Sequence, residues 1–236
     1  MNVDLAHELA ALNEVGWTDV SADRGITEIA QQLGTPVPSR RGQVIVNHLK
    51  PMSREQAHPR SMSAAFGLGA LPFHTDGAYF PVPPRFVLLR AEEVTSEDRP
   101  TLLHDTHALF DERERALLKL GVWRTTGYGR PFLSSVWSDS LVAGQDVLRY
   151  DPCCMIPLTR PADVSSDLIS RRVCETPPIS LYWSQSRTVL IDNWRILHAR
   201  GSPSPVTRHE QRVLARVLIA TEIRNGMGLR APVAKN

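Results

Sequence analysis

The sequence predicts a mainly β protein with flanking helices, folded as a double-stranded β-helix, the cupin-like jelly-roll barrel. Short stretches rich in β-branched and aromatic residues recur along the chain between turn-forming residues, which is typical of sandwiches and barrels. Helical patterns flank these strands rather than alternating regularly with them. No repeat or linker divides the 236 residues, so we expect a single domain, 1–236, with one sizeable core.

The N-terminal flank, residues 1–34, is expected to be helical. Residues 3–15 carry leucines at four- and three-residue spacing, which places them on one stripe of a helix. A second helix is predicted over 25–33, where Gly34 and the following prolines end the pattern.

The centre of the chain contains most of the predicted strands. Asp105 or Thr106 can cap one further helix, which runs to Leu120 with acidic residues in its first turns. Strands are expected at 44–49, 86–91, 122–126, 132–136, 147–150, 179–183 and 188–191.

Two segments have the composition of loops that cover a site. Residues 51–72 are rich in Pro, Ser, Ala and Gly, and a loop of this length inside a domain is usually functional or disordered. Residues 157–178 are polar and contain prolines, with room for a short helix near 163–173. Both are candidate lid loops, whereas 224–236 reads as a loose tail.

The last predicted strand, 212–220, has one wholly apolar face. Its odd-numbered residues are all apolar, and its even-numbered residues begin with Arg212, Leu214 and Arg216. Leucine and alanine share the arginine face, so we expect that face to be partly enclosed. An enclosed arginine needs a bidentate anionic partner, which a dicarboxylic cosubstrate would provide.

Two short segments carry residues that suit a metal ion. His74 and Asp76 are two positions apart, and alternate residues of a strand point to the same face, roughly 7 Å apart. His198 follows in the stretch DNWRILH. A His-x-Asp pair alone is a weak signal. Two histidines and one carboxylate together are the ligands of non-haem Fe(II) oxygenases, which leave the other metal positions open.

Four stretches in order, FHTDGAYFPVPPRFVLLRAEE, RPTLLHDTHALF, TVLIDNWRILHARGSPSP and QRVLARVLIA, carry a family resemblance. With their connections they cover most of residues 35–221. The chain resembles the Fe(II)/2-oxoglutarate-dependent oxygenases of the taurine dioxygenase and clavaminate synthase-like branch. The resemblance implies His74, Asp76 and His198 as both the metal ligands and the catalytic centre.

The same resemblance implies a cosubstrate site and a reaction. Arg212 would pair with the distal carboxylate of 2-oxoglutarate, helped by the hydroxyl of Thr101, and Arg216 would meet an anionic group of the substrate. The spacing from His198 leaves an exchange of roles between Arg212 and Arg216 open. The enzyme would use Fe(II), 2-oxoglutarate and O2, and decarboxylate 2-oxoglutarate to succinate and CO2. Because Asp76 is retained, hydroxylation, desaturation, cyclisation or epoxidation is favoured over halogenation.

The substrate is less constrained by the sequence. Arg149 alternates with apolar neighbours and could face the cavity, although a salt bridge at its rim is the commoner role. His104 could line the pocket or simply begin a helix. With Arg216, these residues favour a small polar, anionic or amino-acid-like metabolite, and a step in specialised metabolism suits such an enzyme.

Composition excludes several other classes of function. The net charge is only +2, and no window interleaves basic and aromatic residues as a nucleic-acid groove does. No apolar stretch approaches the ~20 residues that span a bilayer, and no signal peptide is recognisable. Cys153, Cys154 and Cys174 lack metal-site spacing and are expected to be buried thiols, the first two on a strand. We therefore expect a cytoplasmic protein without nucleic-acid or membrane partners, and leave a homo-oligomer open.

Two other readings use the same residues. Two histidines and an aspartate can hold Zn²⁺ and activate water for hydrolysis, but this leaves Arg212 and Thr101 without a purpose. A barrel that binds a small molecule without turnover is the second alternative, and the intact ligand set argues against it.

Overall fold

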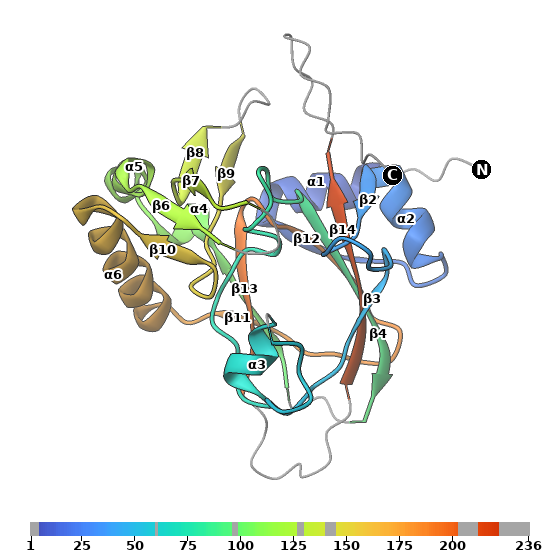
Figure 1. The fold of residues 1–236 in the computed structure, drawn as a ribbon. Coiled ribbons are helices and arrows are strands. Elements are labelled where there is room, and N and C mark those ends of the chain that lie inside the picture. The colour runs from blue at the N-terminus through green and yellow to red at the C-terminus, as the bar shows by residue number, and fades with distance from the viewer. Residues whose placement is uncertain are drawn as a thin grey trace.

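A computed structural model describes residues 5–59, 61–95, 99–126, 130–139, 145–202 and 212–221. In these residues the strands form two main antiparallel sheets and two small ones (Figure 1). The main sheets share an apolar core that lies between them. The predicted double-stranded β-helix is therefore confirmed, although its sheets do not close into a continuous barrel.

The larger main sheet has the strand order β1, β12, β4, β14, β2, and β3 also pairs with β14. All of these pairs are antiparallel, and the β4–β14 pair has a bulge where its register shifts. The strands are β1 (Trp17–Val20), β2 (Thr35–Val37), β3 (Asn47–Leu49), β4 (Phe86–Val94), β12 (Thr188–Asp192) and β14 (Arg212–Ala220).

Helices α1 (Ala6–Val15) and α2 (Ile26–Leu33) pack on the outer face of the larger sheet. Gly16 ends α1 with φ 81°, a left-handed conformation that glycine adopts without strain, and its N–H donates to the Leu12 carbonyl. Both predicted helices are confirmed. The flank 1–34 is not wholly helical, however, because β1 lies between the two helices and pairs with β12.

The alternation predicted for 212–220 determines how β14 is placed. Val217 and Ile219 pack in the core beneath the N-terminal helices, and Leu218 packs in the core between the sheets. Arg212 and Arg216 lie on that inner face too, where they line a cavity. A single period-two pattern thus buries one face of the strand and directs both arginines into the interior.

The smaller main sheet has the order β11, β5, β13, and an isolated bridge between His74 and His198 extends it beyond β13. Residues from both main sheets, together with Trp183 just after β11, form the core between them, including Leu89, Leu103, Leu181, Ile196 and Leu218. The strands are β5 (Thr101–Asp105), β11 (Ile179–Leu181) and β13 (Ile196–Arg200).

A second group of helices and short strands packs around another apolar cluster, which also contains Leu197 of β13. Its largest buried members are aromatic, among them Phe110, Trp123 and Trp137. The elements of this group are α4 (Thr106–Leu109), α5 (Glu112–Leu120), α6 (Arg160–Glu175), β6 (Trp123–Thr125), β7 (Phe132–Ser134), β8 (Trp137–Asp139), β9 (Asp146–Leu148) and β10 (Met155–Pro157).

No helix in the described ranges is both long and apolar enough to cross a membrane.

The single helix predicted from 105 or 106 to 120 is divided into α4 and α5. Asp105 caps α4 as expected, since its carboxylate accepts from the His107 N–H. Asp111 then begins a new helix with a capping box: its carboxylate accepts from the Glu114 N–H, and the Glu114 carboxylate accepts from the Asp111 N–H. The backbone of Asp111 is extended in this cap, and the helix is therefore interrupted at Asp111.

The two candidate lids differ in their placement. Residues 51–72 include the short helix α3 (Met62–Phe66), and many of them line the cavity between the sheets. Residues 157–178 consist mostly of α6, which packs against α5 and provides none of the residues that line this cavity. The structure therefore does not support a lid role for 157–178. The expected tail, 224–236, lies outside the described residues.

Candidate metal centre

A cavity of about 1080 Å³ lies between the two main sheets. Strands β4 and β14 contribute one part of its wall, and β5 and β13 contribute another. Residues of the 51–72 segment, of β3 and the loop before it, and of the turn before β10 also line it. Both main sheets are thus needed to form this cavity. Each sheet is held together by contacts between residues that are far apart in the sequence.

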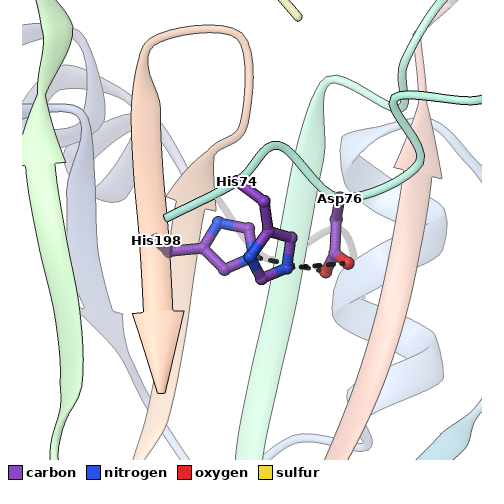
Figure 2. A group of neighbouring side chains, drawn as sticks. All are labelled: His74, Asp76 and His198. Carbon is purple, nitrogen blue, oxygen red and sulfur yellow. Dashed lines mark ion pairs between the residues drawn. The ribbon is translucent and has the colours of Figure 1, made fainter. Parts of the chain in front are cut away.

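His74, Asp76 and His198 meet at the cavity wall (Figure 2). The His74 and His198 backbones bond to each other in both directions, with N–H to carbonyl distances of 3.0 and 3.1 Å. One ligand atom from each of the three side chains lies within 4.8 Å of the others, and each residue is at most 8% exposed. The predicted ligand residues are therefore brought together by the fold.

The donor set fits a divalent transition metal. The Nδ1 of His74 lies 2.9 Å from the Pro72 carbonyl oxygen, so Nδ1 carries the proton and Nε2 keeps its lone pair for a metal. The Nε2 of His198 lies 3.6 Å from a carboxylate oxygen of Asp76. Two imidazole nitrogens and one carboxylate on one side of a site leave the cavity side open, as oxygen-activating Fe(II) sites require.

Asn193, which the sequence did not single out, holds the backbone of Asp76. Its Oδ1 accepts from the Asp76 N–H at 2.8 Å, and its Nδ2 donates to the carbonyls of Asp76 at 2.9 Å and Pro84 at 2.8 Å. The side chain is fully buried. These three bonds link the turn that follows β12 to the ligand segment, and so link β13 with His198 to Asp76.

We expect Asn193→Ala to weaken both the fold and the metal site. The variant leaves one N–H and two carbonyls without partners in a buried place, which should lower the free energy of unfolding by at least about 2 kcal/mol. Loss of a group that orients a ligand should also weaken Fe(II) binding roughly 10- to 100-fold. Urea unfolding and anaerobic metal titration measure the two effects. Gln185→Ala, which removes an exposed amide, is the control, and unchanged Fe(II) affinity in Asn193→Ala would contradict the positioning role.

Charge favours the ligand-competent forms of these side chains. Burial alone would raise the pKa of Asp76, but the Arg216 guanidinium and the hydrogen bond and charge of His198 lower that pKa below its usual range. Burial lowers the pKa of His74, and repulsion from His198 lowers it further, against attraction by Asp76 and Asp151. Asp76 is therefore a carboxylate and His74 a neutral imidazole, the forms that bind a metal.

The residues predicted to bind cosubstrate and substrate line the same cavity. Arg212 is 6% exposed, and its Nη1 donates to the Arg99 carbonyl at 2.5 Å. The hydroxyl of Thr101 accepts from the Trp183 Nε1 at 2.9 Å. Arg216 is closest to the metal cluster, because its Nη1 lies 2.7 Å from an Asp76 carboxylate oxygen.

Two predicted substrate residues lie elsewhere. Arg149 does not line the cavity: its guanidinium donates to the carbonyls of Ala78, Phe80 and Pro81, and so clamps the turn after Asp76. His104 is also absent from the lining; it is 3% exposed and its ring packs 4.5 Å from that of Phe73. Both side chains are buried, but neither faces the cavity.

The expectation for the cysteines is corrected in part. Cys153 and Cys154 occupy a turn before β10 rather than a strand, and Cys153 is exposed, as is Cys174. All three are free thiols. Although Cys153 is exposed as a residue, partial burial of its thiol, followed by the negative charge of Asp151, raises its pKa to about 11, and burial raises the pKa of Cys154 as well. Both therefore remain protonated and unreactive near neutral pH.

No protein-family model matches the sequence, and no curated protein matches it. Solved structures do share the fold. An asparagine oxygenase in complex with Fe(II), 3-hydroxyasparagine and succinate superimposes with a TM-score of 0.70 at 16% identity, over 92% of this chain and 79% of that one. The non-haem iron oxygenase OrfP, in complex with Fe, succinate and (3S)-hydroxy-L-Arg, superimposes with a TM-score of 0.70 at 16% identity, over 93% of this chain and 80% of that one. PvcB from Pseudomonas aeruginosa superimposes with a TM-score of 0.66 at 14% identity, over 92% of this chain and 80% of that one. This chain therefore has the fold of these structures over nearly its whole length.

Proposed function

We propose that this protein is an Fe(II)- and 2-oxoglutarate-dependent dioxygenase of the taurine dioxygenase and clavaminate synthase-like family. The observation that carries the proposal is the buried His74, Asp76 and His198 cluster, which opens into a cavity that is also lined by two arginines. The shared fold with an asparagine oxygenase and OrfP, both crystallised with iron and succinate, supports it. The reaction would oxidise, most simply hydroxylate, a small polar metabolite.

The ligand set determines which chemistry is available. Bound Fe(II) would activate O2 and couple substrate oxidation to decarboxylation of 2-oxoglutarate to succinate and CO2. The protein contributes binding, orientation and exclusion of water. Asp76 occupies one metal position with its carboxylate, so that position is not open to a halide, and an oxygen-derived outcome is favoured over halogenation.

Arg212 and Thr101 are proposed to bind the distal carboxylate of 2-oxoglutarate. Arginine matches a carboxylate with two parallel donors, and its burial strengthens the interaction. Arg216 is less suited to this role, because its Nη1 already lies 2.7 Å from the metal-binding carboxylate. An anion bound by Arg216 would therefore lie beside the metal, whereas the distal carboxylate of a chelated 2-oxoglutarate lies a carbon chain away from it.

The substrate would occupy the cavity next to Arg216, which is proposed to bind an anionic group. The residues of the 51–72 segment that line the cavity are proposed to cover the bound substrate. The asparagine oxygenase and OrfP structures hold hydroxylated amino acids, which supports an amino-acid-like substrate here. A role in specialised metabolism and a cytoplasmic location remain part of this proposal.

An anaerobic titration of the metal-free protein with Fe(II) and 2-oxoglutarate tests the proposal. A weak visible charge-transfer band that requires both additions is expected, because 2-oxoglutarate chelates the metal through its keto oxygen and near carboxylate. Succinate release in air with candidate substrates then follows turnover. Tight Zn²⁺ binding with hydrolysis and without this band would favour a zinc hydrolase, and an absence of metal binding would favour a binding barrel without turnover.

A further inference from the structure

The 51–72 segment has an apolar side that faces the cavity. Most of its residues that line the cavity are apolar, and the largest of them are Met52, Met62 and Leu71. Arg54 and Glu55 of the same segment are exposed and do not line the cavity. The segment therefore directs apolar side chains inward and these two charges toward solvent. We call Met52, Met62 and Leu71 the apolar wall.

The apolar wall is separate from the apolar cores that stabilise the fold. None of its three residues belongs to the three core clusters of the described residues. Met52 is 38% exposed, although it lines a cavity. Apolar surface that is left in contact with water binds an apolar group favourably, because burial removes both surfaces from water. Apolar side chains gathered in a cavity beside polar groups are typical of a ligand site.

The 51–72 segment is fixed to both main sheets. It follows β3, whose Leu49 is paired with Leu214 of β14 in the larger sheet. At its other end, the Leu71 N–H donates to the Arg200 carbonyl of β13 at 2.9 Å, and the Arg200 guanidinium donates to two glycine carbonyls of the segment. The segment, with α3 at its middle, thus crosses from one main sheet to the other (Figure 1). The apolar wall is therefore in place before a ligand binds.

The cavity is larger than a cosubstrate and a free amino acid require. Its volume is about 1080 Å³, whereas a cavity of about 150 Å³ is enough to hold benzene. 2-Oxoglutarate and a free amino acid are each no more than about twice the size of benzene, so together they would fill roughly half of the cavity. The metal cluster and the two arginines lie on the sheets and on the ligand segment, so the space that remains includes the side bounded by the apolar wall.

We propose that the substrate is an amphiphile, whose polar end reacts at the metal cluster and whose other end is an apolar chain or ring that lies against the apolar wall. This inference rests on the proposed function, because it defines the far end of the substrate of the same site. Methionine suits such a wall, since its unbranched, polarisable side chain adapts to apolar groups of different shape. Each added methylene group that is buried there should strengthen binding about three- to fourfold.

Two homologous series test the proposal by anaerobic calorimetry, on protein with and without Fe(II) and 2-oxoglutarate. The first runs from L-norleucine through L-2-aminooctanoate to L-2-aminodecanoate, and extends the side chain. The second runs from N-acetyl- through N-butyryl- to N-hexanoyl-L-alanine, and extends a substituent on the amine. In at least one series the four added methylene groups should raise the affinity about 100-fold. The series that responds shows where the apolar group is attached.

Replacing the two methionines should remove most of this dependence on chain length. The double variant Met52→Gln/Met62→Gln keeps the approximate size of both side chains and makes them polar, so the gain along the series should fall below about 10-fold. Met52→Leu/Met62→Leu restores an apolar surface and should restore the gain. Leu68→Gln is the matched control, because Leu68 belongs to the same segment, is 51% exposed and does not line the cavity.

Four outcomes overturn the proposal: an affinity that does not rise along either series, no binding of any member, a rise that is unchanged in the glutamine double variant, or an equal loss in Leu68→Gln. The charge-transfer titration is run on the same samples. A normal band without dependence on chain length rejects the apolar site and leaves the proposed function standing. A methionine-dependent rise without the band supports the apolar site and rejects the oxygenase assignment.

Discussion

Replacing Asp76 with alanine is expected to abolish Fe(II)-dependent consumption of 2-oxoglutarate and to leave the overall fold intact. The variant removes the single carboxylate of the ligand cluster, whose oxygens lie 3.9 Å from the Nε2 of His74 and 3.6 Å from that of His198. Loss of an outer-shell partner typically costs 10- to 100-fold in affinity or activity, so loss of a direct ligand should exceed about 100-fold. Anaerobic Fe(II) titration and succinate release in air measure the effect.

The control for Asp76→Ala must separate metal binding from folding. The variant also deprives Arg216 of its ion pair, so some loss of stability is expected and is measured by thermal unfolding. Asp76→Asn preserves the shape and a hydrogen-bond acceptor for Arg216, and should be equally inactive but less destabilised. Asp163→Ala, on the exposed face of α6, should behave as the unmodified protein. Full activity in Asp76→Ala would show that the metal cluster is assigned incorrectly.

The features that the sequence can predict depend on local chemistry. The period-two pattern of 212–220 shows which face is buried, and the helix at 25–33 is delimited by Gly34. Imidazole and carboxylate side chains at His74, Asp76 and His198 suit a metal whatever surrounds them. For these features, a residue type and a spacing already contain most of the physical cause.

The features that were missed depend on contacts between distant segments. Strand β1 is four residues long and owes its conformation to pairing with β12, not to any pattern of its own. Asn193 bonds to Asp76 across 117 residues of sequence, and nothing in its local sequence distinguishes it from an ordinary turn asparagine. For Arg149 the sequence left open a position facing the cavity or a salt bridge at its rim, whereas its guanidinium donates to three backbone carbonyls. The polar composition of 157–178 also suggested a loop. The segment instead forms α6, because one stripe of small and apolar residues is enough to bury one face of that helix.

Arg212→Ala should raise the concentration of 2-oxoglutarate needed for half-maximal turnover far more than that of the substrate. A charge-assisted hydrogen bond contributes about 1.5–3 kcal/mol, which corresponds to roughly 10- to 150-fold in affinity. Arg216→Ala should give the opposite pattern, because Arg216 is beside the metal and is proposed to bind the anionic group of the substrate. The half-saturating concentrations of both compounds, measured for both variants, form a complete test of the two roles.

Arg212→Lys distinguishes recognition from simple charge. Lysine keeps the positive charge but not the planar pair of donors, so it should restore only part of the affinity for 2-oxoglutarate. Arg212 also donates to the Arg99 carbonyl, and thermal unfolding of each variant shows how much of any effect comes from that contact. If Arg216→Ala instead weakens 2-oxoglutarate and Arg212→Ala weakens the substrate, the two roles are exchanged. If neither variant changes the requirement for 2-oxoglutarate, its distal carboxylate is not bound by β14. Thr101 and its neighbours on β5 are then the next residues to test.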